Sequence, residues 1–254
     1  ASCLVGSEMC IRDRFVPEIS GTSSLSSLAD ITGLSSANVS VIISQDGAAA
    51  GYYLWLTTAK SISDVGAKLG ALSAGKVNQS WAWVAGFPMS NGVELDTLMF
   101  SNGTFYNNVP QSQLDSLSDY GYCFLRKFTG YTGSYNNQPN TASLFTSDFH
   151  YIYSNRVIDK AERVIYANTI PALSSPIVLN SDGTMTDSSV AYFESLANTA
   201  LDVMVRNGEI SAYSVVIDPA QNVLSTNKIV ETVKILPVGV ADFIEINIGF
   251  TTQI

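Results

Sequence analysis

Apolar residues recur with the period of an α-helix in two stretches of the second half of the chain. The first helix is predicted over Ser154 to Asn168, and Pro171 is expected to stop it. The second is predicted from Thr186 or Asp187, either of which caps the first amides, to Asn207-Gly208, where glycine suits the left-handed position. The two predicted buried stripes are Val157, Ile158, Ala161, Val164 and Ile165, then Val190, Phe193, Ala197, Ala200, Leu201 and Met204.

Three alternating segments follow these helices and predict strands over 211–217, 228–236 and 241–250. Pro237 to Gly239 breaks the run between the last two. The final segment alternates isoleucine and phenylalanine with polar residues and ends close to the end of the sequence. Such a strand needs a partner edge, which either its own sheet or a neighbouring molecule supplies.

The first half predicts short buried strands over 39–44, 81–87 and 122–128, with helices over 61–72 and at Leu114 to Leu117. Asp46-Gly47 ends the first of these strands, and residues 51–58 continue with aromatic and aliphatic side chains in a strand-like run. This order is typical of an α/β layer with parallel strands. A loop rich in Gly, Asn, Tyr and Ser at 130–143 marks a boundary. We therefore expect an α/β region over 15–145 and a second domain over 146–254.

The composition excludes several classes of protein. Hydrophobic residues make up 46% of the 254 positions and charged residues only 14%, which is typical of a globular chain. The net charge of −9 argues against binding to nucleic acid, which requires clustered Lys and Arg. No apolar run reaches the ~18–20 residues of a membrane span, so we expect no membrane insertion.

Residues 1–14 (ASCLVGSEMCIRDR) resemble translated adapter sequence and are treated as an artefactual leader. We therefore expect the chain to be a fragment whose true N-terminus is missing. Cys3 and Cys10 fall inside this run, which leaves Cys123 alone. One thiol supports neither a disulfide framework nor a metal cluster.

The sequence offers no catalytic motif, and we expect no enzyme activity, no metal and no cofactor. His150 is the only histidine, and no G-x-S-x-G elbow accompanies it, so we interpret it as structural. Trp55, Trp81 and Trp83 lie in apolar runs and are expected to be buried. If they were exposed they would suit the stacking of sugars, which leaves an extracellular carbohydrate-binding or adhesion module as the alternative function.

Three segments of the second half resemble contractile tail sheath proteins. They are NRVIDKAERVIY at 155–166, AYSVVIDPAQN at 212–222 and VETVKILPVGVADFIEINIG at 230–249. The order of helices and strands from about residue 147 onward agrees with the C-terminal domain of that family, and residues 39–128 are compatible with part of its middle domain. The resemblance implies an α/β (α+β) fold in which two helices pack on a mixed or antiparallel sheet after a partial middle domain.

The same resemblance implies a mechanical role. The chain would be a structural subunit that forms stacked rings around a tail tube and contracts to drive the tube through a cell envelope. Its partners would be other copies of itself, the tail tube protein, and baseplate and terminator proteins, in a virion tail assembled in the host bacterial cytoplasm. The parent system could be a phage or a contractile injection system.

Two groups of residues are candidates for these contacts. Phe243, Ile244, Ile246, Ile248 and Phe250 are candidates for a strand added to a neighbouring subunit, although an internal strand explains the alternation equally well.

Arg156, Lys160 and Arg163 follow helical spacing and are candidates for contact with the tube. Asp159 and Glu162 lie beside them, and we favour local pairing on a solvated face.

Overall fold

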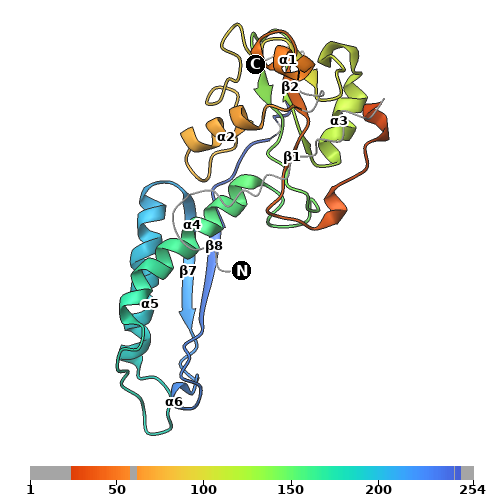
Figure 1. The fold of residues 1–254 in the computed structure, drawn as a ribbon. Helices are drawn as coiled ribbons and strands as arrows, with labels where there is room; N and C mark the ends of the chain where they lie inside the picture. The colour runs from red at the N-terminus through yellow and green to blue at the C-terminus, as the bar shows by residue number, and fades with distance from the viewer. Residues whose placement is uncertain (1–23, 58–61, 243, 247–254) are drawn as a thin grey trace, which may run out of the picture.

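The computed structural model describes residues 24–57, 62–242 and 244–246. It has two parts: a lobe that holds the short helices and strands of the first half, and an arm that extends from it (Figure 1). The arm consists of two long helices beside a two-stranded sheet. The predicted α/β class is therefore confirmed at the level of mixed helices and small sheets.

In the part of the chain that the structure describes, the lobe has three small strand pairs rather than one wide sheet. One pair is parallel and two are antiparallel: β1 (Val41–Ile42) with β4 (Tyr122–Cys123), β2 (Ser44–Asp46) with β3 (Leu98–Phe100), and β5 (Leu125–Arg126) with β6 (Tyr135–Asn136). The strands predicted near 39–44 and 122–128 are present, each divided into two short pieces.

The lobe helices are α1 (Ala50–Thr57), α2 (Val65–Ala74) and α3 (Gln111–Asp119), with short 3₁₀ turns η2 (Leu25–Ser27), η3 (Thr32–Leu34) and η4 (Tyr106–Asn108). The helices predicted over 61–72 and at Leu114 to Leu117 are confirmed as α2 and α3 with shifted ends. The strand-like run at 51–58 is not a strand, because residues 50–57 form α1. Asp46 stabilises the turn between β2 and α1, because its carboxylate accepts hydrogen bonds from the amides of Ala48 and Ala49 just before α1 begins.

The strand predicted over 81–87 is wrong, because this segment is a series of turns. The amides of Gly86 and Phe87 both donate to the carbonyl of Trp83, and a side chain at Gly86 would collide with the Trp83 ring. Trp81 is buried and donates to the carbonyl of Asn137. Trp83 is 53% exposed, so the predicted burial of tryptophans holds for Trp55 and Trp81 only.

The arm contains α4 (Ile152–Thr169), η5 (Ile170–Ala172), α5 (Asp187–Arg206), β7 (Ile210–Ile217), α6 (Val223–Thr226) and β8 (Glu231–Pro237). Helices α4 and α5 pack on the antiparallel pair β7–β8 (Figure 1). The predicted ends of α5 are confirmed: the Thr186 hydroxyl accepts from the Ser189 amide, and Gly208 takes a φ of 68°. Ile158 departs from its predicted stripe and is exposed.

Helix α4 takes part in two separate hydrophobic cores. Ile152, at its start, packs in the lobe with Trp81 and Leu72. Val157 and Ala161, five and nine residues further on, pack in the arm with Leu201 and Met204 of α5. The same helix therefore closes the lower side of the lobe and forms one wall of the arm.

Candidate assembly surface

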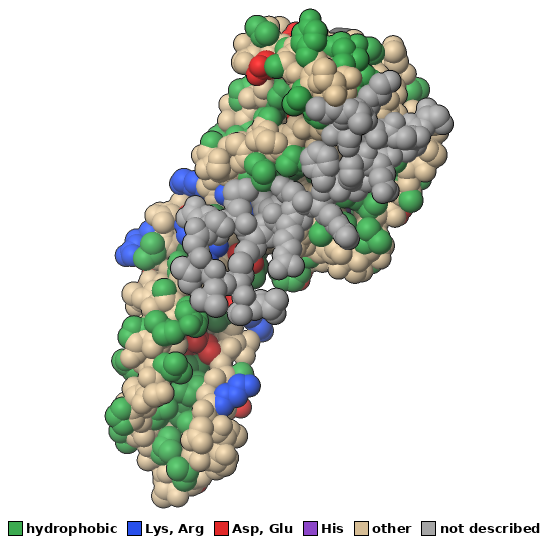
Figure 2. Space-filling model, in the orientation of Figure 1, with side chains coloured by type: hydrophobic (Ala, Val, Ile, Leu, Met, Phe, Trp, Pro, Cys, Tyr) green, Lys and Arg blue, Asp and Glu red, His purple; other side chains and the backbone are tan. Residues whose placement is uncertain are grey.

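The sheet of the arm presents one face to the helices and the other to solvent. Tyr213, Val215, Val233 and Ile235 face the helices. The cross-strand pairs on the outer face are Ala212 with Leu236, Ser214 with Lys234, and Val216 with Thr232. Leu236 and Val216 are more than half exposed there. Figure 2 shows apolar side chains exposed along much of the visible face of the arm.

Tyr213 fixes the sheet to α5. Its hydroxyl donates to the Asp202 carboxylate at 2.7 Å. Burial, together with this carboxylate, raises the pKa of Tyr213 to about 12, so the hydroxyl stays protonated and remains a donor.

Within the residues that the structure describes, the arm sheet has two strands only. Each of these strands therefore keeps one edge that no other described strand covers. An open edge of this kind is a template for an additional strand, because its main-chain amides and carbonyls point outward in a regular row. The outer edges of β7 and β8 are thus the places where the geometry of the arm accepts another extended segment.

The chain leaves β8 at Pro237 and runs back toward the lobe (Figure 1). Residues 238–242 and Ile244 border a cavity of ≈ 930 Å³ that is also lined by lobe residues, among them Trp83, Phe124 and Arg126. Burial raises the pKa of Asp242, and Asp242 contributes after burial to the raised pKa of Tyr151. This segment therefore runs beside the beginning of α4.

The described part of the predicted final strand is not a strand. Residues 241, 242 and 244–246 pair with no other segment that the structure describes, and Ile244 and Ile246 are 80% and 74% exposed. Phe243, Ile248 and Phe250 lie outside the described residues. The role of this group in joining subunits therefore stays a prediction, with two exposed isoleucines as its visible part.

The three basic candidates on α4 have different surroundings. Arg156 is buried, and its guanidinium donates to the carbonyls of Gly75 and Lys76. Lys160 donates to the Glu209 carboxylate at 2.6 Å.

Arg163 is exposed and lies near enough to Asp159 to oppose the rise that burial causes in the pKa of that carboxyl. Helical spacing places Arg156, Lys160 and Arg163 on one side of α4. Of these three, Arg163 is the one that is exposed and not paired with Glu209. Contact with a tube stays a prediction, and Arg163 is its exposed member.

His150 lies just before α4 and is buried. Its Nδ1 lies 2.7 Å from the carbonyl oxygen of Ser143, and its ring contacts those of Phe145 and Tyr151. Burial lowers the pKa of His150, which favours the neutral ring. These contacts support the structural interpretation of this residue.

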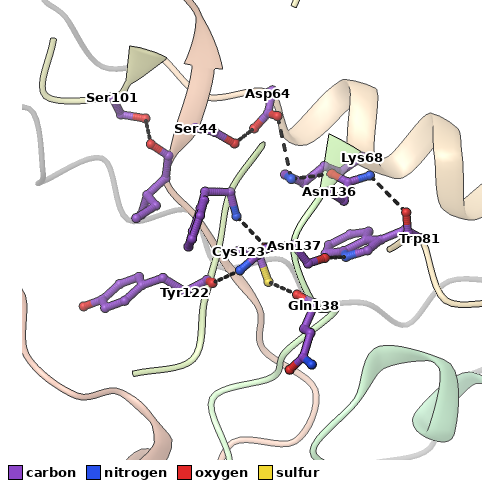
Figure 3. A network of polar contacts seen from close by, with 12 residues as sticks. Ser44, Asp64, Lys68, Trp81, Ser101, Tyr122, Cys123, Asn136, Asn137 and Gln138 are labelled. Carbon is purple, nitrogen blue, oxygen red and sulfur yellow. Dashed lines mark hydrogen bonds and ion pairs between the residues drawn. The ribbon is translucent and has the colours of Figure 1, made fainter. Parts of the chain in front are cut away.

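The lobe contains a buried polar network that the sequence analysis did not single out (Figure 3). The Lys68 ammonium group donates to Asn136 Oδ1 at 2.6 Å and lies 3.8 Å from Asp64 Oδ2. The Ser44 hydroxyl donates to the other Asp64 oxygen, and the Asn136 amide nitrogen lies 3.5 Å from the Trp81 carbonyl. A sequence signal did exist, since Lys68 shares the face of Val65 and Leu72 on an apolar helix.

The described residues contain no group of three or more His, Cys, Asp or Glu side chains placed to hold a metal ion. They also contain no helix with the length and apolar character that crossing a membrane requires.

Comparison with family models matches both parts of the chain. Residues 21–139 match the model "DUF2586, N-terminal domain", and residues 148–254 match "DUF2586, C-terminal domain". The chain belongs to the DUF2586 family. The two matches follow each other in order and together cover most of the sequence. A comparison with curated proteins finds no match.

Solved structures show where else the DUF2586 fold of this chain occurs. One is a chain in the cryo-EM structure of the anti-feeding prophage (AFP) baseplate, with 17% identity and a TM-score of 0.59. Another is a chain in the contracted sheath complex of PVC, an extracellular contractile injection system, with 14% identity and a TM-score of 0.59.

Each match covers 86% of this chain, which spans 56% and 58% of the length of those chains. At this level of identity the likeness establishes the fold.

Proposed function

We propose that this DUF2586 chain is a structural subunit of a contractile tail sheath. In this role it polymerises as stacked rings around a tail tube and contracts to drive the tube through a cell envelope. The observation that carries the proposal is that one chain has both features that strand addition requires. Among the described residues the arm sheet has two strands with uncovered edges, and a separate segment exposes Ile244 and Ile246. The fold shared with chains of an injection-system sheath and baseplate supports it.

Strand addition explains why these isoleucines are exposed. Burial of one isoleucine side chain stabilises by about 1.5–3 kcal/mol, and this chain obtains little of that at either position. A neighbouring sheet edge would bury one face of the segment and bond its main chain, with the alternation of side chains setting the register. In this proposal the segment of one subunit supplies the apolar side chains and main-chain groups that a strand edge of the next subunit requires.

Attachment to the tube would rest on weaker contacts. We assign Arg163 as the tube-contact residue, because it is exposed while Arg156 is buried and Lys160 is paired with Glu209. An exposed charge pair is worth about 0–1 kcal/mol, which is small enough to break when subunits move. Many such contacts along a tube would hold an extended sheath and release it during contraction.

The remaining partners follow from this role. They are other copies of the chain, the tail tube protein, and baseplate and terminator proteins, in a virion tail or injection system that assembles in the bacterial cytoplasm. The alternative function as a glycan-binding module has one supporting observation, the exposed ring of Trp83 packed edge-on against Phe87. Trp55 and Trp81 are buried and do not extend this surface.

The test is the assembly state of the natural protein that carries this chain. Size-exclusion chromatography with light scattering and negative-stain microscopy should show rings or tubes, alone or with the tube protein of the same gene cluster. A monomer at every concentration, with and without the tube protein, would contradict the proposal. Monomeric protein that binds a glycan array, and loses that binding with Trp83→Ala, would establish the alternative.

A further inference from the structure

Lys68 and Asn136 place an amine against an amide carbonyl in the centre of the lobe. Lys68 Nζ lies 2.6 Å from Asn136 Oδ1. Because a carbonyl bond is about 1.23 Å long, Nζ lies no farther than about 3.8 Å from the Asn136 Cγ carbon. Reacting atoms in near-attack arrangements lie about 3–3.5 Å apart, so only a small movement separates this pair from bonding distance.

The surroundings exclude water from all three polar side chains. Lys68 is fully buried, Asn136 is 1% exposed, and the side chain of Asp64 is 2% exposed. The Trp81 ring lies over the Lys68 nitrogen at 5.1 Å (Figure 3). Among the described residues Asp64 Oδ2 has no hydrogen-bond partner, and the Lys68 ammonium group faces it at 3.8 Å, so this oxygen is placed to take up the Lys68 proton. A charged amine is costly in such a place, and the network gives it one carboxylate at 3.8 Å.

Burial favours the neutral forms of both Lys68 and Asp64. It lowers the pKa of Lys68 and raises the pKa of Asp64. Transfer of one proton from the ammonium group to the carboxylate therefore produces a nucleophilic amine and a carboxylic acid without bringing in any other reactant.

We propose that Lys68 and Asn136 join in an intramolecular isopeptide bond, with Asp64 carrying the proton between the amine and the leaving group. This modification is independent of the role of the chain in a sheath.

The reaction balances with the groups present. The neutral Lys68 amine attacks Asn136 Cγ, and the bond between Nζ and Cγ forms while the carbonyl electrons move to Oδ1. One proton leaves Nζ through the Asp64 carboxyl and reaches Asn136 Nδ2. The bond between Cγ and Nδ2 then breaks, ammonia departs, and the carbonyl re-forms as a secondary amide. No oxidant, metal or cofactor takes part.

The product would change the mechanics of the lobe. It would tie α2 to β6 across 68 positions of sequence and replace a buried ion pair with a neutral amide. The segment between the two residues, which carries the turns near Trp81 and Trp83, would become a closed covalent loop. A lobe linked in this way cannot separate α2 from β6 under load without breaking a covalent bond.

Mass spectrometry of the intact, folded wild-type chain tests the proposal. The expected mass is lower than that of the sequence by one ammonia, and a tryptic digest should contain one branched peptide with Lys68 joined to Asn136. On a denaturing gel the wild-type chain should run ahead of the variant Asp64→Asn, which keeps both reacting residues but lacks the proton carrier. Lys68→Met and Asn136→Ala should also keep their full sequence masses.

Loss of ammonia has one other common source, cyclisation of asparagine to a succinimide. That reaction would leave the peptides of Lys68 and Asn136 separate and would persist in Lys68→Met. Either result would overturn the proposal. So would a folded wild-type chain that retains its full mass after prolonged incubation, and this measurement decides the matter even if every variant fails to fold.

Discussion

Lys160 of α4 and Glu209, which lies in the turn between α5 and β7, form an ion pair with a nitrogen–oxygen distance of 2.6 Å. The Glu209 side chain is 7% exposed and that of Lys160 is 29% exposed. The pair therefore connects the two long helices and the start of the sheet at one point. Its position at the boundary of solvent puts its strength between that of an exposed pair and a buried one.

Replacement of Lys160 with methionine should destabilise the arm by about 2 kcal/mol, because it leaves the Glu209 carboxylate buried without its cation. Urea unfolding measures the change in the free energy of unfolding. Lys234→Met on the exposed face of β8 is the matched control and should change that free energy by less than about 0.5 kcal/mol. Equal changes in the free energy of unfolding for Lys160→Met and Lys234→Met would show that the ion pair does not stabilise the arm.

The double variant Ile244→Asp with Ile246→Asp should abolish assembly and leave the melting temperature unchanged, because both side chains are exposed in the single subunit. Light scattering and microscopy measure the assembly. Leu173→Asp, another exposed apolar position, is the control and should assemble normally. Removal of residues 241–254 should act like the double variant, and rings formed by the shortened chain would rule out strand exchange.

Arg163→Glu should weaken attachment to the tube without changing the fold, because Arg163 is exposed. Co-sedimentation with tube protein measures attachment, and Arg206→Glu, at an exposed position near the end of α5, serves as the control. Attachment unchanged by Arg163→Glu would leave this arginine as part of a solvated face.

Arg156→Glu should behave differently and destabilise the chain by about 3 kcal/mol, since it buries a carboxylate against the carbonyls of Gly75 and Lys76. Thermal unfolding distinguishes this loss of stability from a loss of binding. A stable Arg156→Glu variant would show that this side chain leaves its buried site at little cost.

Glu231 makes the stability of the arm depend on pH. Burial, followed by the nearby Glu194, raises its pKa above 4.5, so the folded chain holds this proton more tightly than the unfolded chain. The stabilisation is complete at pH below 4.5 and is lost as pH rises through the raised folded-state pKa.

Glu231→Gln should therefore be more stable than the wild type at neutral pH and equal to it under acid conditions. Melting temperatures across this range measure the effect, with Glu162→Gln on the exposed side of α4 as the control. Parallel pH profiles for Glu231→Gln and the wild type would contradict the assignment.

Local signals were sufficient to predict the arm. Thr186, the apolar stripe of α5 and Gly208 all act within a few residues of one another, so the period and the caps determine the helix. The strands β7 and β8 alternate because one face packs on those helices.

The lobe depends on contacts between distant residues, which no local pattern reveals. Residues 81–87 have the composition of a strand, but Gly86 packs on the Trp83 ring and the segment turns. Lys68 is buried because Asn136, 68 positions later, accepts its hydrogen bond. The candidate site shows the same division: helical spacing groups Arg156, Lys160 and Arg163, yet tertiary contacts decide which of them is exposed.

The course of α4 through both hydrophobic cores has a mechanical consequence. With 18 residues the helix is about 27 Å long, and it has no proline or glycine at which to bend. A torque applied at the far end of the arm is therefore carried to Trp81 by one stiff lever. Subunits of this shape would change their packing by rotating as rigid bodies. The deformation would then occur at the interfaces between subunits.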